Sequence, residues 1–382
     1  MRLCFFSSVE SFDTGMPICT FKLIAGFAKN PAYDVYVILS GRGEFSERLD
    51  REKIRYRIIP FVRLRSVGFL DDFLKFCFGW IFASIKIYRY VKSNAISIVH
   101  FSDLIDAPFY PSAKWGGAAV VAHVRMCISN PVHRKIFSFV TMAYADKIIC
   151  ISNAVKTAGT FSDKKTTVVL DPGPDYSIFD PVKASHERPP QVEQNKIRAI
   201  AIAKFVEAKG HDYFVNMAGL VETELPGKIQ FIIVGDKEKG HERFYVNVMD
   251  AARHANVLQS ITVLGQVRHE EIPSILSDSD IFVHLPRCQE GLGGVILEAM
   301  AMGLPVVAFD SGGVRECFRD TTDGFLVKQF DVGAAAKSVV RLAQDPGLRK
   351  AMGAAAQEYV RANFTLCRHV GNVEKVYQSI VG

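Results

Sequence analysis

The chain has 382 residues, of which 49% are hydrophobic and 23% charged. At about 100–200 residues per domain this length predicts two or three packed domains, and the composition excludes disorder, collagen and coiled coil as the main architecture. The net charge of +6 is concentrated in residues 48–92, which hold eleven Lys and Arg against four Asp and Glu.

Cysteine usage and the apolar segments predict a cytoplasmic protein. The eight cysteines are scattered and form no C-x-x-C pair, as is typical of reduced core cysteines. Residues 1–15 lack the long apolar stretch and cleavage site of a signal peptide. The most hydrophobic window, residues 69–91, contains five charged side chains, so it is predicted as a buried or interfacial helix and not as a spanning one.

Short apolar runs alternate with helical patterns along the first half of the chain. Strands are predicted at residues 2–6, 34–39, 56–59, 96–100, 118–124, 147–151 and 167–170. Helices are predicted between them, for example at residues 18–28, 71–92 and 131–143. The strand runs are rich in β-branched residues with little polar alternation, which is typical of strands buried on both faces of a parallel sheet.

A polar stretch, residues 181–196, is predicted to be an interdomain linker, and a second strand–helix series follows it. Strands are predicted there at residues 197–203, 228–234, 261–264, 281–285, 306–309 and 324–327, and helices at 211–220, 244–253, 294–301, 332–344 and 348–361. We therefore predict an α/β protein with two Rossmann-like doubly wound domains facing a cleft, residues 1–180 and 197–364. In such sheets ligands bind beyond the carboxyl ends of the strands.

The densest functional signal is the Gly-rich stretch C-Q-E-G-L-G-G-V-I-L-E-A-M-A-M-G-L-P-V-V-A, which begins at Cys288. Its glycines let the backbone approach a ligand closely, and the free amides at the start of the following helix favour an anion or a polar ligand. Glu290 on the loop and Glu298 about one turn into the helix are predicted to face the same cleft and to accept hydrogen bonds from sugar hydroxyls. The alternative is a loop in which the glycines only make the turn.

This stretch resembles the signature of family 4 of the retaining, nucleotide-sugar-dependent glycosyltransferases, which have the GT-B fold. The family pattern E-x-F-G-x-V-x-x-E-A-M-A-x-G-x-P-V-V-A matches residues 290–308, with Leu292 in place of the usual Phe. The resemblance implies that Glu290 contacts the donor sugar and that Glu298 contacts the nucleotide ribose. It also implies that the intervening loop faces the sugar and the phosphate through Gly291, Leu292, Gly293, Gly294 and Val295.

A second stretch, I-A-K-F-V-E-A-K-G at residues 202–210, resembles the family's V-G-R-L-x-x-x-K-G, in which an Arg and a Lys clamp the donor diphosphate. Lys204 stands at the Arg position and Lys209 at the Lys position. Two cations at a strand-to-helix loop can neutralise a diphosphate leaving group. Because Lys lacks the bidentate fork of Arg, Lys204 is expected to weaken or reshape donor binding. The alternative is two solvated lysines in a loop.

The resemblance is weaker in the first half of the chain. The loop F-D-T-G-M-P keeps one glycine, Gly15, where the family usually has two over the donor phosphates. Where relatives often carry T-x-H, this chain has His123 and Arg125. We expect Arg125 to contact a phosphate or the acceptor and keep His123 as the alternative, with an ordinary core histidine as its simpler interpretation. The resemblance also implies that residues 365–382 form a helix that crosses back to the first domain.

The resemblance implies that the chain moves a sugar from a UDP- or GDP-sugar to a hydroxyl of a glycan or lipid-linked acceptor, with retention and without a metal or a further cofactor. Cell-surface polysaccharide or glycolipid synthesis is the expected context. An epimerase of the same fold and a non-catalytic nucleotide-sugar-binding subunit are the alternatives. Residues 48–92 predict contact with an anionic membrane surface, and nucleic acid is not an expected partner.

Overall fold

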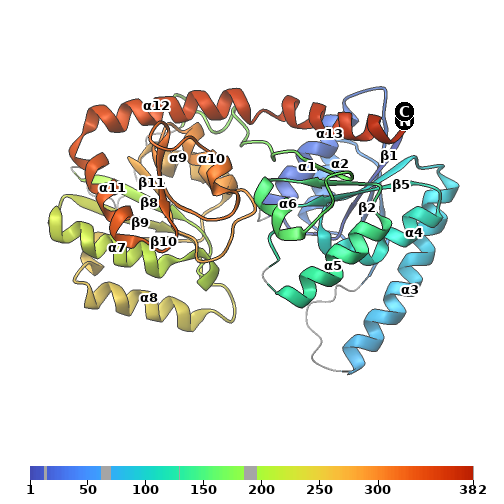
Figure 1. The fold of residues 1–382 in the computed structure, drawn as a ribbon, viewed down its shortest axis with the longest axis horizontal. Coiled ribbons are helices and arrows are strands. Elements are labelled where there is room, and N and C mark those ends of the chain that lie inside the picture. The colour runs from blue at the N-terminus through green and yellow to red at the C-terminus, as the bar shows by residue number, and fades with distance from the viewer. Residues whose placement is uncertain (13–14, 62–69, 129, 185–195, 382) are drawn as a thin grey trace. The chain divides into compact units, whose positions relative to one another are not determined.

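The computed structural model describes residues 1–12, 15–61, 70–128, 130–184 and 196–381, and the chain divides into two compact units (Figure 1). Unit 1 comprises Met1–Pro172 together with Leu366–Gly382, and unit 2 comprises Gly173–Thr365. Most of the expected linker, residues 185–195, lies outside the described residues.

Unit 1 is built around a seven-stranded parallel sheet of order β3-β2-β1-β4-β5-β6-β7. Its strands are β1 (Arg2–Ser7), β2 (Asp34–Leu39), β3 (Tyr56–Ile58), β4 (Ile98–Phe101), β5 (Ala119–Val124), β6 (Lys147–Cys150) and β7 (Thr166–Val168). β1 and β4 are buried along nearly their whole length, which explains their continuous apolar runs.

Helices cover both faces of this sheet (Figure 1). They are α1 (Gly15–Ala28), α2 (Glu44–Arg51), α3 (Leu70–Ser93), α4 (Tyr110–Trp115), α5 (Pro131–Tyr144), α6 (Asn153–Gly159) and α13 (Leu366–Val381). On one face α1 packs against α13, whose Val373, Val376 and Tyr377 complete the core around Phe5 and Phe27. On the other face α3, α4 and α5 follow one another. The last helix of the chain is therefore part of unit 1.

Unit 2 repeats the plan with a six-stranded parallel sheet of order β10-β9-β8-β11-β12-β13. Its strands are β8 (Ile197–Ile202), β9 (Ile229–Val234), β10 (Ile261–Gly265), β11 (Ile281–His284), β12 (Val306–Asp310) and β13 (Gly324–Lys328). Its helices are α7 (His211–Glu224), α8 (Glu242–His254), α9 (Ile272–Ser277), α10 (Gly294–Ala301), α11 (Val332–Gln344) and α12 (Pro346–Asn363). The helices α7, α8 and α11 bury one face, and α10 with α12 lies on the other.

The predicted fold class is confirmed, because both units are doubly wound α/β layers with parallel sheets. In unit 2 the strand order reverses between β8 and β11, which lie next to each other in the sheet. Such a switch point is where open α/β sheets bind ligands. None of the helices in the described part of the chain is long and apolar enough to cross a membrane.

Candidate active site

The loops after β8 and β11 lie against each other at the switch point of unit 2. The Arg287 amide donates to the carbonyl of Ala208 at 2.9 Å, which joins the two loops through their backbones. Gly210 has a φ of +69°, and a Cβ built on it would lie 2.0 Å from the carbonyl oxygen of Leu285. Only glycine fits there, so this residue brings the end of one loop onto the end of β11.

This junction places Lys209 beside Glu290, two residues that the sequence separates widely. The Lys209 Nζ lies 2.8 Å from Oε1 of Glu290, and the two side chains are 35% and 17% exposed. The Glu290 backbone is held by the neighbouring loop, since the Gly313 amide donates to its carbonyl at 2.9 Å. Two residues assigned separately by the sequence, one to the diphosphate and one to the sugar, thus form an ion pair.

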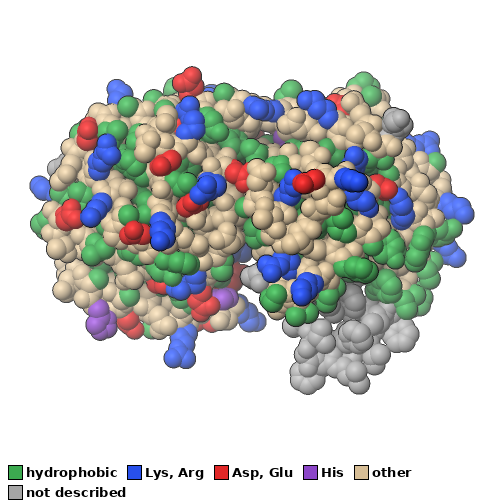
Figure 2. Space-filling model, in the orientation of Figure 1, with side chains coloured by type: hydrophobic (Ala, Val, Ile, Leu, Met, Phe, Trp, Pro, Cys, Tyr) green, Lys and Arg blue, Asp and Glu red, His purple; other side chains and the backbone are tan. Residues whose placement is uncertain are grey.

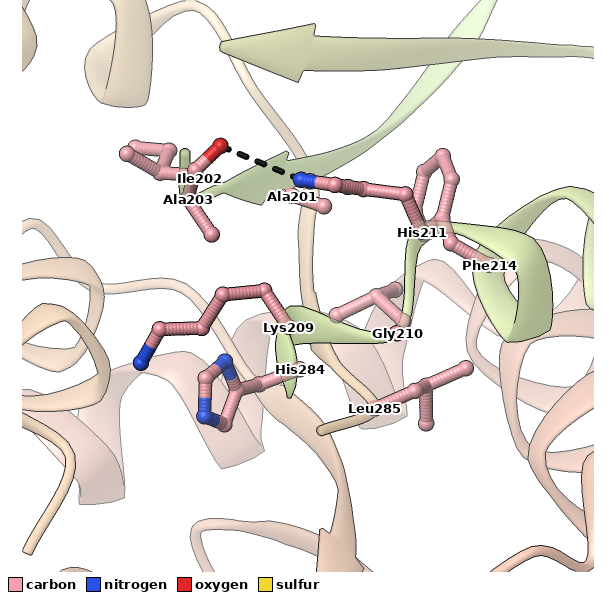
Figure 3. A pocket seen from close by; sticks show the side chains of 10 residues that line it. Ala201, Ile202, Ala203, Lys209, Gly210, His211, Phe214, His284 and Leu285 are labelled. Atoms are coloured by element: carbon pink, nitrogen blue, oxygen red, sulfur yellow. Dashed lines mark hydrogen bonds between the residues drawn. The ribbon is translucent and has the colours of Figure 1, made fainter. Parts of the chain in front are cut away.

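A third group of this cluster, His284, was missed by the sequence analysis. His284 ends β11, and its Nε2 lies 3.8 Å from the same Oε1 of Glu290. The close-up shows the His284 ring and the Lys209 ammonium side by side at the edge of a hollow (Figure 3). Apolar residues and two histidines line this hollow, which is formed by Ala201, Ile202, Ala203, Lys209, Gly210, His211, Phe214, Val283, His284 and Leu285.

The ionisation states in the cluster follow from burial and from the lysine. Burial lowers the pKa of His284 to about 4, so its imidazole is neutral near pH 7. Burial is also the largest influence on Glu290 and would raise its pKa, but attraction to His284 and Lys209 and the hydrogen bond from Lys209 outweigh it and lower the pKa. Because His284 is neutral near pH 7, we assign the stabilisation of the carboxylate there mainly to the Lys209 ammonium.

Lys204 lies on the same loop as Lys209, but its side chain is more exposed to solvent. Its side chain is 44% exposed, and its ammonium lies 3.3 Å from a carboxylate oxygen of Glu238. The Nε2 of His211 lies 3.1 Å from the carbonyl oxygens of both Ala203 and Lys204. Since a carbonyl only accepts, that nitrogen carries the proton and ties the start of α7 to the end of β8 (Figure 3 draws the contact to Ala203).

The Gly-rich loop leads directly into α10, as its sequence predicts. Gly293, with a φ of +111°, precedes the first helical residue, Gly294, which is exposed. Leu292 is buried, and its carbonyl accepts a 2.9 Å hydrogen bond from the Cys317 thiol. Gly291 and Val295, on either side of these residues, are partly exposed. The loop therefore buries its apolar side chain and leaves the beginning of the helix open to a ligand.

Glu298 faces a basic partner of its own. Its Oε1 lies 3.0 Å from Nε2 of His269, and the Glu298 side chain is 20% exposed. The His269 ring packs on Phe179 with ring centroids 5.4 Å apart. Each glutamate of the motif is thus held by a nitrogen from another part of unit 2. The sequence analysis missed His269 as well, because nothing in its own surroundings singles it out.

The candidate residues of unit 1 lie at the carboxyl end of β5 and at the start of α1. Arg125 is 6% exposed, and it donates from Nε to Asp171 at 3.1 Å and from a terminal nitrogen to the Ser102 carbonyl at 2.8 Å. The structure gives Arg125 these internal partners, and its expected phosphate or acceptor contact stays a prediction. Gly15 is exposed and begins α1, while residues 13 and 14 of its loop lie outside the described residues.

His123 belongs to a buried chain of polar groups. Its Nδ1 lies 3.1 Å from Nε2 of His100, whose Nδ1 lies 2.7 Å from the hydroxyl of Tyr377 on α13. Burial is the largest influence on both histidines and holds their pKa values well below the ordinary value, so both are neutral near pH 7. These contacts connect two strand ends to the last helix, which is a structural role for His123; its catalytic role stays a prediction.

The whole chain adopts the fold of GT-B glycosyltransferases. The structure of Anabaena Alr3699/HepE in complex with UDP superposes with a TM-score of 0.81 and 17% identity, covering 99% of this chain and 100% of that one. The sucrose-phosphate synthase of Thermosynechococcus elongatus superposes with a TM-score of 0.79 and 16% identity, covering 100% and 99% of the two chains. At these identities the likeness establishes the fold alone.

Residues 182–359 match the family Glycosyl transferases group 1. The alpha-D-kanosaminyltransferase of Streptomyces kanamyceticus is 33% identical over 179 residues, which are 47% of this chain and 45% of that enzyme. Against this first relative the chain therefore aligns over less than half of the enzyme's length. The UDP-Gal:alpha-D-GlcNAc-diphosphoundecaprenol alpha-1,3-galactosyltransferase of Escherichia coli is 24% identical over 368 residues, covering 92% and 90%.

Proposed function

We propose that this protein is a retaining nucleotide-sugar glycosyltransferase that uses a UDP- or GDP-sugar as donor. The observation that carries the proposal is the cluster of Lys209 and Glu290 at the switch point of unit 2, followed by the open start of α10. The cluster supplies a cation for a diphosphate and a carboxylate for sugar hydroxyls in one place. The match to the group 1 family spans these residues.

In the proposed reaction the bond between the sugar anomeric carbon and the phosphate oxygen breaks while the acceptor oxygen bonds to the same face. The departing phosphate oxygen takes the acceptor proton, so the protein needs no dedicated base. Lys209, with Lys204 beside it on the loop, stabilises the charge of the leaving diphosphate. Glu290 orients the sugar and Glu298 holds the ribose hydroxyls. Ammonium groups can supply this charge, so the proposal requires neither a metal ion nor a further cofactor.

A thermal-shift screen with UDP, GDP, ADP and their sugars tests the donor class. A ligand at about 100 times its Kd should raise the free energy of unfolding by about 2.7 kcal/mol. Transfer is then measured with the stabilising sugar nucleotide, and the anomeric configuration of the product is read by NMR. Full activity in the presence of EDTA is expected. No stabilisation by any of these nucleotides, or release of only an epimerised free sugar, would overturn the proposal.

We further propose that the acceptor is glycan or lipid-linked and that unit 1 meets an anionic membrane, in cell-surface polysaccharide or glycolipid synthesis at the cytoplasmic face. The acceptor part rests on the Escherichia coli relative, whose name gives a diphosphoundecaprenol acceptor. Of the segment that the sequence favoured, residues 62–69 lie outside the described residues. The described part of α3 exposes Ile81, Phe82 and Ile85 by 46%, 64% and 43%.

Helix α5 supports the membrane proposal independently. Val132, Ile136 and Phe139 are 62%, 55% and 74% exposed, and their spacing puts them on one side of the helix. The neighbouring Lys135 is exposed as well. Hydrophobic side chains gather over the part of unit 1 that includes α3, α4 and α5, with Lys and Arg side chains beside them (Figure 2). Apolar side chains flanked by cations suit the interface of an anionic bilayer.

Flotation with liposomes tests this surface. The wild-type protein should float with vesicles of phosphatidylcholine and phosphatidylglycerol and much less with phosphatidylcholine alone. Phe139→Ser should reduce flotation, whereas Val246→Ser, which removes an apolar side chain 52% exposed on unit 2, should not. Equal binding of the wild type to both vesicle types, or equal losses in both variants, would refute the membrane contact.

A further inference from the structure

His284 is buried next to two charged groups, Lys209 and Glu290. Its side chain is 6% exposed, and within the described residues Nε2 makes no hydrogen bond. The ring lies nearly parallel to that of Phe282 on the same strand, with the centroids 6.4 Å and the planes 14° apart. A buried polar nitrogen without a hydrogen bond lowers the stability of the fold. Such a nitrogen is therefore expected to gain a partner when a ligand binds or when neighbouring contacts change.

The geometry around Oε1 of Glu290 supplies that partner. Lys209 Nζ lies 2.8 Å from this oxygen, and His284 Nε2 lies 3.8 Å from it. A neutral imidazole can donate from one ring nitrogen, and a carboxylate can only accept. An N–H···O hydrogen bond is about 2.9 Å long, so a movement of about 1 Å would bring the His284 nitrogen into contact. Oε1 can therefore accept a hydrogen bond from His284 in place of the one from Lys209 when the lysine moves away.

This inference rests on the function proposed above, in which Lys209 interacts with two anions, the Glu290 carboxylate and the donor diphosphate. A diphosphate carries more negative charge than one carboxylate, so a bound nucleoside diphosphate draws the ammonium away from Glu290. The Glu290 side chain is only 17% exposed, so the loss of the lysine contact at its Oε1 carries a desolvation penalty. A second donor for the same oxygen removes this penalty.

We propose that His284 is the positioning residue that takes over Oε1 of Glu290 when Lys209 turns to the donor diphosphate. The carboxylate then stays ionised and in place for the sugar while the lysine is engaged elsewhere. His284 touches neither the sugar nor the phosphate in this scheme. It acts through Glu290, and its effect must therefore disappear when the carboxylate is removed.

A double-mutant cycle with His284→Leu and Glu290→Gln tests this dependence. Affinity is measured by calorimetry for whichever of UDP, GDP and ADP the wild type binds most tightly. His284→Leu should weaken binding about tenfold, in keeping with the loss of a hydrogen bond to a charged group, and should change it less than about twofold in the Glu290→Gln background. His284→Gln, which keeps a donor near the same position, should bind within about threefold of the wild type.

The outcomes separate the possible failures. Ile281→Val, a conservative change at a buried site of the same strand, controls for loss of stability and should leave the affinity unchanged. If His284→Leu weakens binding equally in both backgrounds, His284 is only structural and the inference is wrong. If the wild type binds none of the three nucleotides, the proposed function itself fails, and the inference fails with it.

Discussion

Replacing Lys209 by Met would remove the cation nearest to the Glu290 carboxylate while keeping most of the side-chain volume. Exposed ion pairs contribute about 0–1 kcal/mol to stability, and breaking a fully buried pair costs about 3–5 kcal/mol. With side chains 35% and 17% exposed, this pair lies between these limits. We therefore expect Lys209→Met to lower the free energy of unfolding by about 1–2 kcal/mol at pH 7.

The pH dependence of this loss follows from the carboxylate. In the wild type the pKa of Glu290 is lowered, so the group contributes stability above its unfolded pKa and loses it as the pH falls through its folded pKa. Without Lys209, burial should raise the pKa of Glu290, and the sign of its contribution reverses. The difference between wild type and variant should thus be largest near neutral pH and shrink as the carboxylate becomes protonated.

Urea denaturation of four proteins measures the effect: the wild type, Lys209→Met, Glu290→Gln and the double variant. In the Glu290→Gln background the lysine substitution should cost less than about 0.5 kcal/mol, because no buried charge is left unpaired. An equal cost in both backgrounds would refute the assignment of the pair. Turnover of the sugar nucleotide should fall about 100-fold or more in Lys209→Met, whereas Lys337→Met on the exposed side of α11 should be unaffected.

Three further predictions concern stability. The folded pKa of His284 is about 4, so as the pH falls below about 6.5 the unfolded state binds a proton that the folded state does not. The free energy of unfolding, measured as a function of pH, should therefore decline below about pH 6.5, and His284→Leu should make this decline smaller. Gly312→Ala should destabilise by about 1–3 kcal/mol from backbone strain, since φ is +62°, and by more because the new Cβ would lie 2.2 Å from the Glu290 carbonyl oxygen; thermal unfolding measures this. Tyr377→Phe should cost about 1–3 kcal/mol in urea denaturation, because it leaves the buried Nδ1 of His100 unpaired.

The regular elements could be predicted from the sequence because their patterns are local. The runs at 34–39 and 294–301 coincide with the bounds of β2 and α10, and the other strand ends lie within two residues of the predicted ones. The helix α10 is equally short but follows the Gly-rich motif, whereas the short helices α2, α4, α6 and α9 were not predicted, since six to eight residues give too little periodicity. Local patterning therefore suffices for long elements and for strands buried on both faces.

The contacts of the site could not be predicted in the same way. His284 ends the apolar run I-F-V-H and has the sequence context of an ordinary strand residue. Only the pairing of β8 with β11 and the close approach at Gly210 bring it beside Lys209. Arg125 shows the same limit, because its partner Asp171 lies 46 residues further along the chain. A polar residue at the carboxyl end of a central strand is the one local signal that could have drawn attention to His284.

The return of α13 to unit 1 has a consequence for how the protein folds during synthesis. Unit 2 is one continuous segment, Gly173–Thr365, whereas the core of unit 1 includes Val373, Val376 and Tyr377. A ribosome therefore finishes all of unit 2 before it supplies the helix that seals the first sheet. Domains generally fold as they emerge, so we expect unit 2 to complete its fold before unit 1 does. Until α13 is synthesised, the apolar face of unit 1 around Phe27 stays partly exposed and needs protection from aggregation.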